Sequence, residues 1–234
     1  MIAPAMLNTG ARHSICSHHV AEASGGEYGE PHPAFTVPSL LAPLLMQDML
    51  IVRQSHDVTD FLFTRRTIKF TIMTESDNTL FDAVIHLTNL TRMKDTFFDV
   101  MITDRSNNVI ITSEKRFHTM TVCSPADSVI GYISCKSFCL RPKYTIQDKN
   151  KQTVLRMSGP FLRCPLFNEV QFPITSADGV FRVAGISNLW NGCCLTQYCV
   201  AYDKFHVNFP RDMDVQIKAV ILCSALLLNV SFFE

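Results

Sequence analysis

The residues best suited to chemistry lie where an alternating segment meets a polar join near the end of the sequence. Apolar and polar side chains alternate in Phe205–Phe209, which is followed by Pro210–Asp212. Carboxylate and backbone oxygens in such a join are the ligands that a hard cation such as calcium takes. A plain β-strand followed by a helix cap fits equally well, since Phe205, Val207 and Phe209 would share one face of a strand. Both interpretations stay open at this point.

Other reactive residue types do not form a recognisable catalytic or structural-metal pattern. His118 and His206 stand outside any nucleophile motif, and a lone histidine is more often structural. Closely spaced cysteines, including Cys193-Cys194, have no second pair at a structural-zinc spacing. A glycine-rich phosphate loop is absent as well. The sequence therefore predicts no catalytic residues and no enzyme.

The charge balance argues against a nucleic-acid partner. Lys+Arg and Asp+Glu both number 21, so the formal net charge is +0, and no aromatic-basic platform is visible. The first twenty or so residues contain no unbroken apolar region of the kind that signal peptides have, and nine cysteines show no disulfide framework. We therefore expect the protein to begin in the cytosol, with reduced thiols.

The elements that must position the polar join are mostly short strands. Alternating segments and turn signals recur along the chain, at Thr67–Ile72, at Val109–Ile111 after Asn107-Asn108, at Tyr144–Gln147 and Val154–Met157 around Asp148–Lys151, and at Val180–Val183 after Asp178-Gly179. No alternation of strands with helices is seen. The pattern predicts an antiparallel all-β sheet or barrel.

One helix is expected, at about residues 213–233. Asp212 and Asp214 stand where they would favour a helix N-terminus, and the run Ala219–Phe233 is apolar on every face. The run has about fifteen residues, whereas a bilayer crossing usually needs about twenty. It is either a short membrane anchor or a helix buried in the protein. The residues that would form the core or the membrane helix are Val215, Ile217, Val220, Ile221, Leu226 and Leu228.

The N-terminal part has the composition of a flexible arm. Residues 1–45 contain Gly25-Gly26, several prolines and many small polar residues, which bury little surface. We expect an arm that serves as a tether, or that carries self-association or protein partners. Residues 46–234 would form the folded domain, since 47% hydrophobic content supports a large core.

Several blocks in the second half of the chain resemble the phospholipid scramblase family. They are Tyr144–Gln147, Arg156–Pro160, Trp190–Gly192 and Phe205–Val215, and the resemblance continues to Glu234. It covers roughly residues 45 to 234. The resemblance implies a Tubby-like fold, mostly β, in which a closed antiparallel barrel of about a dozen strands surrounds a hydrophobic C-terminal helix. This agrees with the strands followed by one helix that the residues themselves indicate.

The resemblance also implies a calcium-binding loop, which would run from Ala201 to Asp212. The family has acidic side chains at the first, third, sixth and last positions of this loop. Here Asp203 and Asp212 stand at the third and last positions, whereas Ala201 and His206 replace the other two. Two carboxylates, with the backbone carbonyls of Phe205 or Val207, would make at best a weak calcium site, because calcium takes six to eight oxygen ligands.

Two further family features are not matched. Members similar to this chain have a run of adjacent cysteines that carries palmitate, but Cys193-Cys194 is the only adjacent pair here and stands in an apolar stretch. Palmitoylation is therefore not expected. The segment Gly185–Trp190, where some members have a basic import signal, contains no Lys or Arg.

The function implied by the resemblance is ATP-independent, bidirectional movement of phospholipids across a bilayer, with calcium activation. The partner would be a phospholipid membrane, reached from its cytoplasmic face and expected to be the plasma membrane. The alternative is a cytosolic lipid-binding or adaptor module that keeps the C-terminal helix inside the barrel and transports nothing. The two hypotheses differ in whether the helix contacts lipid or protein.

Overall fold

The structure is a computed structural model that describes residues 39–55, 67–88, 97–125, 128–137, 141–160, 170–188 and 204–233. These residues belong to one compact unit, Val37–Glu234. In chain order the elements are η1 (Ser39–Leu41), α1 (Ala42–Leu45), β1 (Met49–Ser55), β2 (Thr67–Thr74), β3 (Thr79–Leu87), β4 (Phe98–Asp104), β5 (Val109–Arg116), β6 (Thr119–Cys123), β7 (Val129–Ser137), β8 (Lys143–Asp148), β9 (Thr153–Ser158), β10 (Val170–Ser176), β11 (Arg182–Asn188), β12 (Lys204–Asn208), α2 (Val215–Leu228) and the π-helical turn η3 (Asn229–Phe233).

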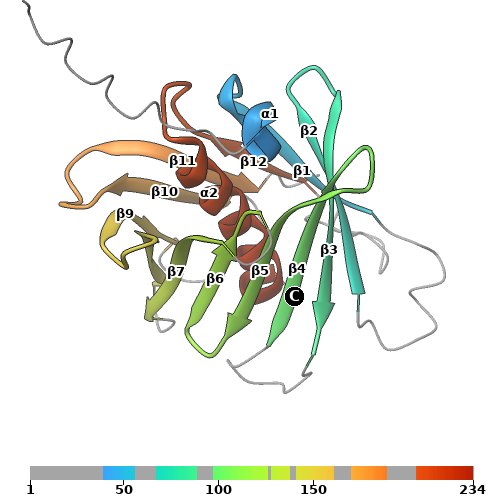
Figure 1. The fold of residues 1–234 in the computed structure, drawn as a ribbon. Coiled ribbons are helices and arrows are strands. Elements are labelled where there is room, and N and C mark those ends of the chain that lie inside the picture. Colours follow the sequence, from blue (N-terminus) through green and yellow to red (C-terminus); the bar gives the residue numbers. More distant parts are fainter. Residues whose placement is uncertain are drawn as a thin grey trace, which may run out of the picture. The chain divides into compact units, whose positions relative to one another are not determined.

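The strands form a closed antiparallel barrel around α2 (Figure 1). Each strand pairs with the next one along the chain, and the barrel closes where β1 pairs with β12, with Leu50 opposite Val207 and Val52 opposite Phe205. Closure leaves no unpaired edge strand in the barrel. The predicted fold class, a mostly β closed barrel with a C-terminal helix, is confirmed.

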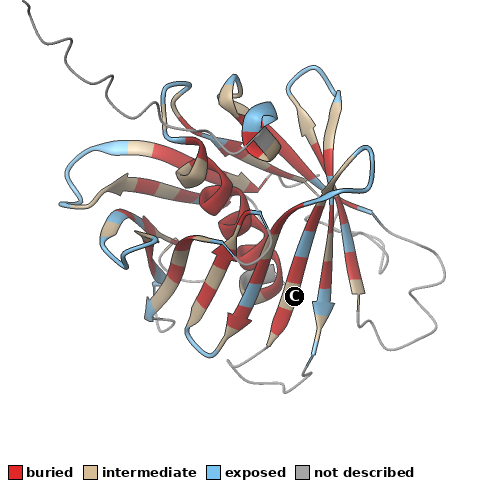
Figure 2. Cartoon of the chain, in the orientation of Figure 1, coloured by how far each residue is buried: buried red, intermediate tan, exposed pale blue. Residues whose placement is uncertain are grey.

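Alternation along the strands determines which side chains enter the barrel. In β2, for example, Ile68, Phe70 and Ile72 are buried, whereas Lys69 between them is exposed. The buried residues of the strands and of α2, coloured red in Figure 2, belong to a single hydrophobic core. The helix comes closest to the wall at β7, where a Cβ added to Gly131 would lie 2.8 Å from Cγ2 of Val220. Only glycine leaves the helix room at that position.

Four turns at one end of the barrel are built alike, and we call this end the turn end. In each turn a residue with positive φ follows a short loop, at Asp77, Asn107, Lys151 and Gly179. The backbone N–H of that residue donates to the carbonyl three residues earlier, as Lys151 does to Asp148 at 3.0 Å. The predicted hairpin between Tyr144–Gln147 and Val154–Met157 is therefore present as β8 and β9.

The hairpin predicted at Asp178-Gly179 is present, but its second strand begins later than expected. We expected strand from Val180, whereas β11 begins at Arg182. The turn extends through Val180 and Phe181, two residues further than predicted, because the N–H of Ser176 donates to the carbonyl of Phe181 at 2.9 Å. Val180 and Phe181 consequently lie in the turn and not on a strand face.

Helix α2 begins at the turn end and is buried along almost all of its length. Asp214 is its N-cap, and one carboxylate oxygen accepts from the N–H groups of Gln216 at 2.7 Å and Ile217 at 3.2 Å. The predicted span 213–233 corresponds to α2 and η3 together, with Asp212 in the preceding turn. Of the six predicted helix residues, five are buried, namely Val215, Val220, Ile221, Leu226 and Leu228, and Ile217 is half-buried.

The helix changes to π-helical geometry at Asn229. This side chain is buried, and its amide Nδ2 donates to Oε1 of Gln54 in β1 at 3.1 Å. Within the described part of the chain, no helix is both long enough and apolar enough to span a membrane.

Packed structure begins before the expected end of the arm. Residues 39–45, which the sequence assigns to the arm, form η1 and α1, and the side chains of Leu41 and Leu44 are fully buried. The composition did not indicate this, because Pro38 and Pro43 are more typical of loops. Pro43 in fact lies in the first turn of α1, where its missing N–H leaves no helical hydrogen bond unmade.

The burial of α2 predicts a specific loss of stability at alkaline pH through Cys223. Burial raises the pKa of this thiol from its ordinary 9.0 to about 12. Because the folded protein holds the proton more tightly than the unfolded chain, the contribution is complete below pH 9.0 and is lost as the pH rises toward about 12. Melting temperatures measured upward from pH 8 should fall less steeply for Cys223→Ala than for the wild type. Equal slopes would contradict burial of the thiol.

Candidate functional site

The polar join that the sequence singled out lies at the turn end, between β12 and α2. Its residues contact the segment that leads into β1. The N–H of Phe209 donates to the carbonyl of Asp48 at 2.9 Å, and Nε of Arg211 donates to the carbonyl of Met46 at 3.1 Å. Two parts of the chain that are far apart in sequence are thus joined where the helix enters the barrel.

Lys218 is the central residue of this join. It lies one turn into α2, its side chain is 0% exposed, and its ammonium group is surrounded by backbone carbonyls. The ammonium donates to the carbonyls of Gln47 at 2.7 Å, Leu45 at 2.9 Å and Arg211 at 2.9 Å, with Leu44 at 3.3 Å. We call Lys218 and these four carbonyl groups the Lys218 cluster.

The number of acceptors matches what an ammonium group needs. Lys218 has three N–H donors, and three carbonyl oxygens lie within 2.9 Å. The ring of Phe209 adds a cation–π contact, with its centroid 5.2 Å from Nζ. Removing an ammonium ion from water costs several kcal/mol, and satisfied hydrogen bonds are what offset that cost. The four carbonyl groups therefore form a cation-binding site, and the cation that they bind is the ammonium group of Lys218.

Opposing effects act on the charge of Lys218. Desolvation lowers the pKa of its amine below the ordinary 10.5, and the carboxylates of Asp48 and Asp212 oppose that shift. The positive charge of Arg211 is a smaller effect that lowers the pKa further. Asp212, which supplies one of the two carboxylates of the predicted calcium loop, thus raises the pKa of Lys218.

The other residues of the predicted calcium loop fall in different environments. Phe205 and Val207 are buried in β12, which pairs with β1 on one side and with β11 on the other. His206 is half-buried and Asp212 is exposed. Ala201, Asp203 and Cys193-Cys194 lie outside the described residues. In the part of the chain that is described, no three His, Cys, Asp or Glu side chains are grouped as a metal site would need. The calcium site stays a prediction.

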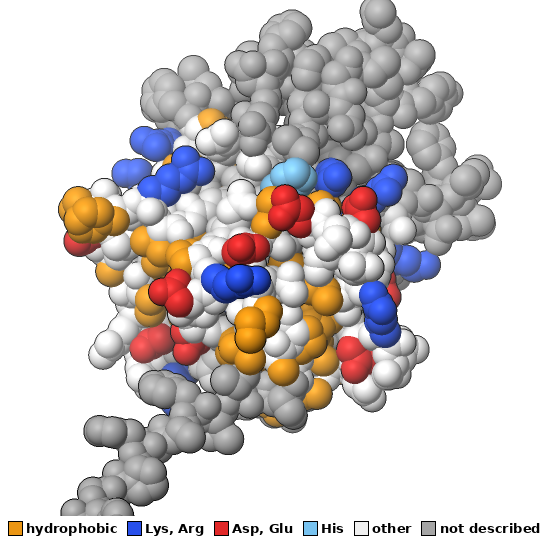
Figure 3. All heavy atoms as spheres, turned by 90° about the horizontal axis from the view of Figure 1, so that it is seen from above, with side chains coloured by type: hydrophobic (Ala, Val, Ile, Leu, Met, Phe, Trp, Pro, Cys, Tyr) orange, Lys and Arg blue, Asp and Glu red, His pale blue; other side chains and the backbone are white. Residues whose placement is uncertain are grey.

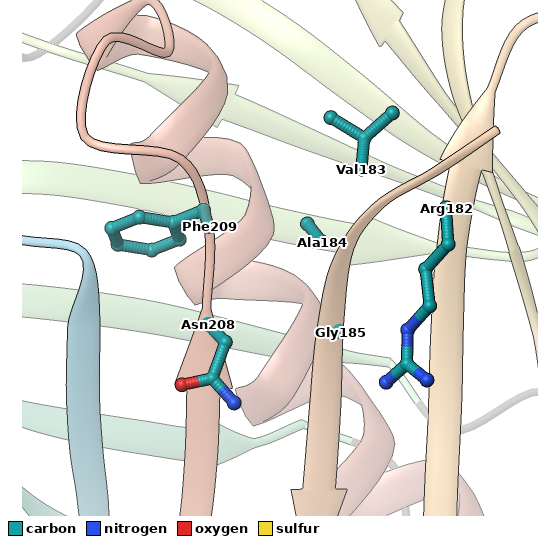
Figure 4. Close-up of a pocket in the computed structure, with 6 residues that line it drawn as sticks. All are labelled: Arg182, Val183, Ala184, Gly185, Asn208 and Phe209. Atoms are coloured by element: carbon teal, nitrogen blue, oxygen red, sulfur yellow. The ribbon is translucent and has the colours of Figure 1, made fainter.

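An open hollow of about 320 Å³ lies beside the join on the outside of the barrel (Figure 4). It is lined by Arg182–Gly185 of β11 and by Asn208 and Phe209. The guanidinium of Arg182 lies over Gly185, where an added Cβ would come within 3.0 Å of its Nη2. A guanidinium and a carboxamide in one hollow are groups that hydrogen-bond an anion such as a phosphate.

Sequence reasoning missed the main residues of this site. The sequence pattern does not single out Lys218, and it assigns Leu44 and Leu45 to the arm, with Gln47 next to it. One signal was available, because a single lysine in an otherwise apolar helix must either reach solvent or find acceptors. The carbonyl groups that receive it carry no sequence signal.

Comparison with known proteins gives one family. The profile of the family described as Scramblase matches residues 29–234. The chain is 28% identical over 222 residues to human phospholipid scramblase 2, covering 87% of this chain and 73% of that protein. It is 26% identical over 220 residues to human phospholipid scramblase family member 5, covering 86% and 80%.

Two further similarities are more limited. Human phospholipid scramblase 1 is 32% identical over 148 residues, which cover 58% of this chain and 46% of that protein. Among solved structures, an Arabidopsis thaliana protein matches with a TM-score of 0.45 and 12% identity, covering 82% of this chain and 99% of that one.

The Lys218 cluster predicts that the lysine stabilises the folded protein. In Lys218→Met the unbranched apolar stem is kept but the ammonium group is lost, which leaves buried carbonyls without a donor, so we expect the free energy of unfolding to fall by roughly 2–5 kcal/mol. Urea denaturation measures this. The matched control is Lys149→Met at an exposed turn, which should change stability by less than about 0.5 kcal/mol. Equal effects of the two substitutions would show that the cluster contributes nothing.

Proposed function

The chain belongs to the phospholipid scramblase family, and from this premise we propose that it promotes bidirectional movement of phospholipids between bilayer leaflets without ATP. The protein would act as a lipid transporter at the cytoplasmic face of the plasma membrane. The observation that carries the proposal is the match of the Scramblase profile over residues 29–234, which includes the barrel, the Lys218 cluster and α2.

Lipid movement requires a way to take a polar headgroup through hydrocarbon. A polar track is one way, but α2 offers little of one, since the hydroxyl of Ser224 donates to the carbonyl of Val220 within the helix at 3.0 Å. The 14 residues of α2 rise about 21 Å, less than the roughly 30 Å of a bilayer core. An inserted α2 would therefore thin the bilayer around it, and thinning shortens the path of the headgroup.

Insertion would require α2 to leave the barrel. The Lys218 cluster is the polar contact that opposes this step at the turn end, because its hydrogen bonds tie the start of the helix to residues 44–47. At a membrane the ammonium could exchange the carbonyls for phosphate oxygens of the headgroups. The functional event in this proposal is the transfer of α2 from protein to lipid.

Calcium would assist this event as an activator. Asp203 and Asp212 are the carboxylates available for a weak site, and Asp212 also raises the pKa of Lys218. Calcium bound at Asp212 would weaken this electrostatic support of the Lys218 ammonium. Activation is therefore expected only at millimolar calcium.

A second candidate is the cytosolic lipid-binding or adaptor module. It is favoured by the burial of α2, whose residues from Lys218 to Leu228 are almost completely inaccessible to solvent. In this hypothesis the helix stays in the core, and the outer surface of the barrel binds its partner. The two candidates make opposite predictions for the exposure of α2 at a membrane.

Lipid movement is tested by reconstituting the full chain into liposomes with a fluorescent phospholipid in both leaflets. An added reductant should bleach more of the fluorescence in proteoliposomes than in empty liposomes, and the fraction should increase with millimolar calcium. Asp212→Asn removes the same electrostatic support of Lys218 that bound calcium would weaken, so it should raise the calcium-free fraction toward the calcium-stimulated one and abolish any further effect of calcium. A bleached fraction identical to that of empty liposomes would rule out the activity.

Exposure of α2 to lipid is tested through the peptide that contains Cys223, which is fully buried in the structure. Vesicles that contain a phospholipid with a photoreactive group in its acyl chain are mixed with the full chain and irradiated, and cross-linked peptides are identified by mass spectrometry. If α2 moves from the barrel into lipid, the Cys223 peptide should be the main cross-linked peptide, ahead of the strand peptides that contain Cys123 and Cys135. Absence of a cross-link to the Cys223 peptide would favour the adaptor hypothesis.

A further inference from the structure

Two bulky apolar side chains are exposed at the tip of the β10–β11 hairpin. Val180 is 69% exposed and Phe181 is 68% exposed, and we call this pair the apolar tip. The hairpin extends from the barrel at the turn end, where its end is coloured as exposed in Figure 2. An adjacent pair of large side chains placed in solvent is unusual, because each loses the free energy of burial.

The fold does not require two large apolar residues at these positions. In three other turns at the same end, the two residues that follow the one with positive φ are Asn78-Thr79, Asn108-Val109 and Gln152-Thr153, of which only Val109 is apolar. Val109 is 36% exposed, about half as much as Val180 or Phe181. The apolar tip therefore places more apolar surface in solvent than the corresponding positions of the other turns, which points to a role in binding.

The backbone N–H groups of the apolar tip already have hydrogen-bond acceptors within the turn. The N–H of Gly179 donates to the carbonyl of Ser176 at 2.8 Å, and the N–H of Phe181 donates to the hydroxyl of Ser176 at 3.1 Å. The N–H of Val180 donates to the carboxylate of Asp178 at 3.0 Å. These groups can leave water without losing hydrogen bonds, which is the condition for entering the interface of a bilayer.

Basic side chains outnumber acidic ones near the turns of the β8–β9 and β10–β11 hairpins. Lys149, Lys151, Arg156 and Arg182 are exposed there, whereas the acidic residues are the half-buried Asp148 and the exposed Asp178. The carboxylate of Asp178 accepts a hydrogen bond from the N–H of Val180 within the turn. Nε of Arg156 donates to the carbonyl of Ala177 at 2.6 Å. Figure 3, a view onto the turn end, shows apolar and basic side chains close together at its left edge.

We propose that the apolar tip docks the protein onto a bilayer surface that contains anionic phospholipids. Val180 and Phe181 enter the interface, and Arg182 binds a lipid phosphate in the hollow that it shares with Asn208. Apolar insertion flanked by positive charge fits the apolar interior and the negative surface of an anionic bilayer. The inference rests on the proposed action at phospholipid membranes and names the surface that makes the contact.

Docking in this way also orients the molecule. The apolar tip is at the same end of the barrel as the start of α2 and the Lys218 cluster, because β10 and β12 both end there. A docked protein therefore presents to the headgroups the end at which the helix is retained.

The test is co-sedimentation of the full chain with vesicles of phosphatidylcholine, with and without phosphatidylserine. The double variant Val180→Asp/Phe181→Asp should bind the phosphatidylserine vesicles at least about tenfold more weakly than the wild type. Arg182→Gln should lower affinity for these vesicles roughly fivefold and lower the weaker binding to pure phosphatidylcholine by a smaller factor, because both lipids carry a phosphate but only phosphatidylserine makes the surface negative. Melting temperatures close to that of the wild type verify that each variant is folded.

The matched control is Phe117→Asp, which removes a phenylalanine that is 64% exposed in the turn between β5 and β6, at the opposite end of the barrel. Its backbone has φ 49°, which aspartate tolerates. Binding unchanged by the double variant, or weakened equally by Phe117→Asp, overturns the docking proposal and leaves the proposed function intact. Tip-dependent docking without any lipid movement in the liposome assay supports the docking and overturns the function.

Discussion

An apolar helix without a polar face is stable in water only when something covers it on all sides, and this constraint organises the whole molecule. The barrel satisfies it because the buried faces of its strands point toward α2. Gly131 has only a hydrogen atom as its side chain, which leaves room where the helix approaches the barrel wall. A sheet that is open on one side would leave part of the helix exposed to water. Closure of β1 onto β12 is therefore required by the helix as much as by the strands.

The same constraint explains which parts of the fold could be predicted. Alternation at Thr67–Ile72 and the turn residues at Asp148–Lys151 specify a strand and a hairpin locally, and both are present. The final helix was predictable because an apolar run after Asp214 has no other stable form. The start of β11 was placed two residues early, since Val180 and Phe181 have high strand propensity and the turn overrides it.

The candidate site was much less predictable than the fold. A lysine near the start of an apolar helix needs hydrogen-bond acceptors or solvent for its ammonium group. In this structure the acceptors are four backbone carbonyls, three of them from residues 44–47. Backbone groups are the same in every residue, so no pattern of side chains identifies them. Packing of residues 39–45 was also not predicted, because Pro38 and Pro43 are typical of loops, although Leu41 and Leu44 are among the best buried side chains. Contacts between distant segments arise only once the barrel has closed.

The order of elements along the chain has a consequence for biosynthesis. Strand β1 is made early, but its partner β12 and the helix that fills the barrel come last. While the ribosome is still adding β12, the earlier strands can form hairpins, yet their inner faces have no helix to cover them and β1 has an open edge. The inner faces of the strands therefore stay uncovered until α2 has been made, and the barrel can close around the helix only after its last strand is available.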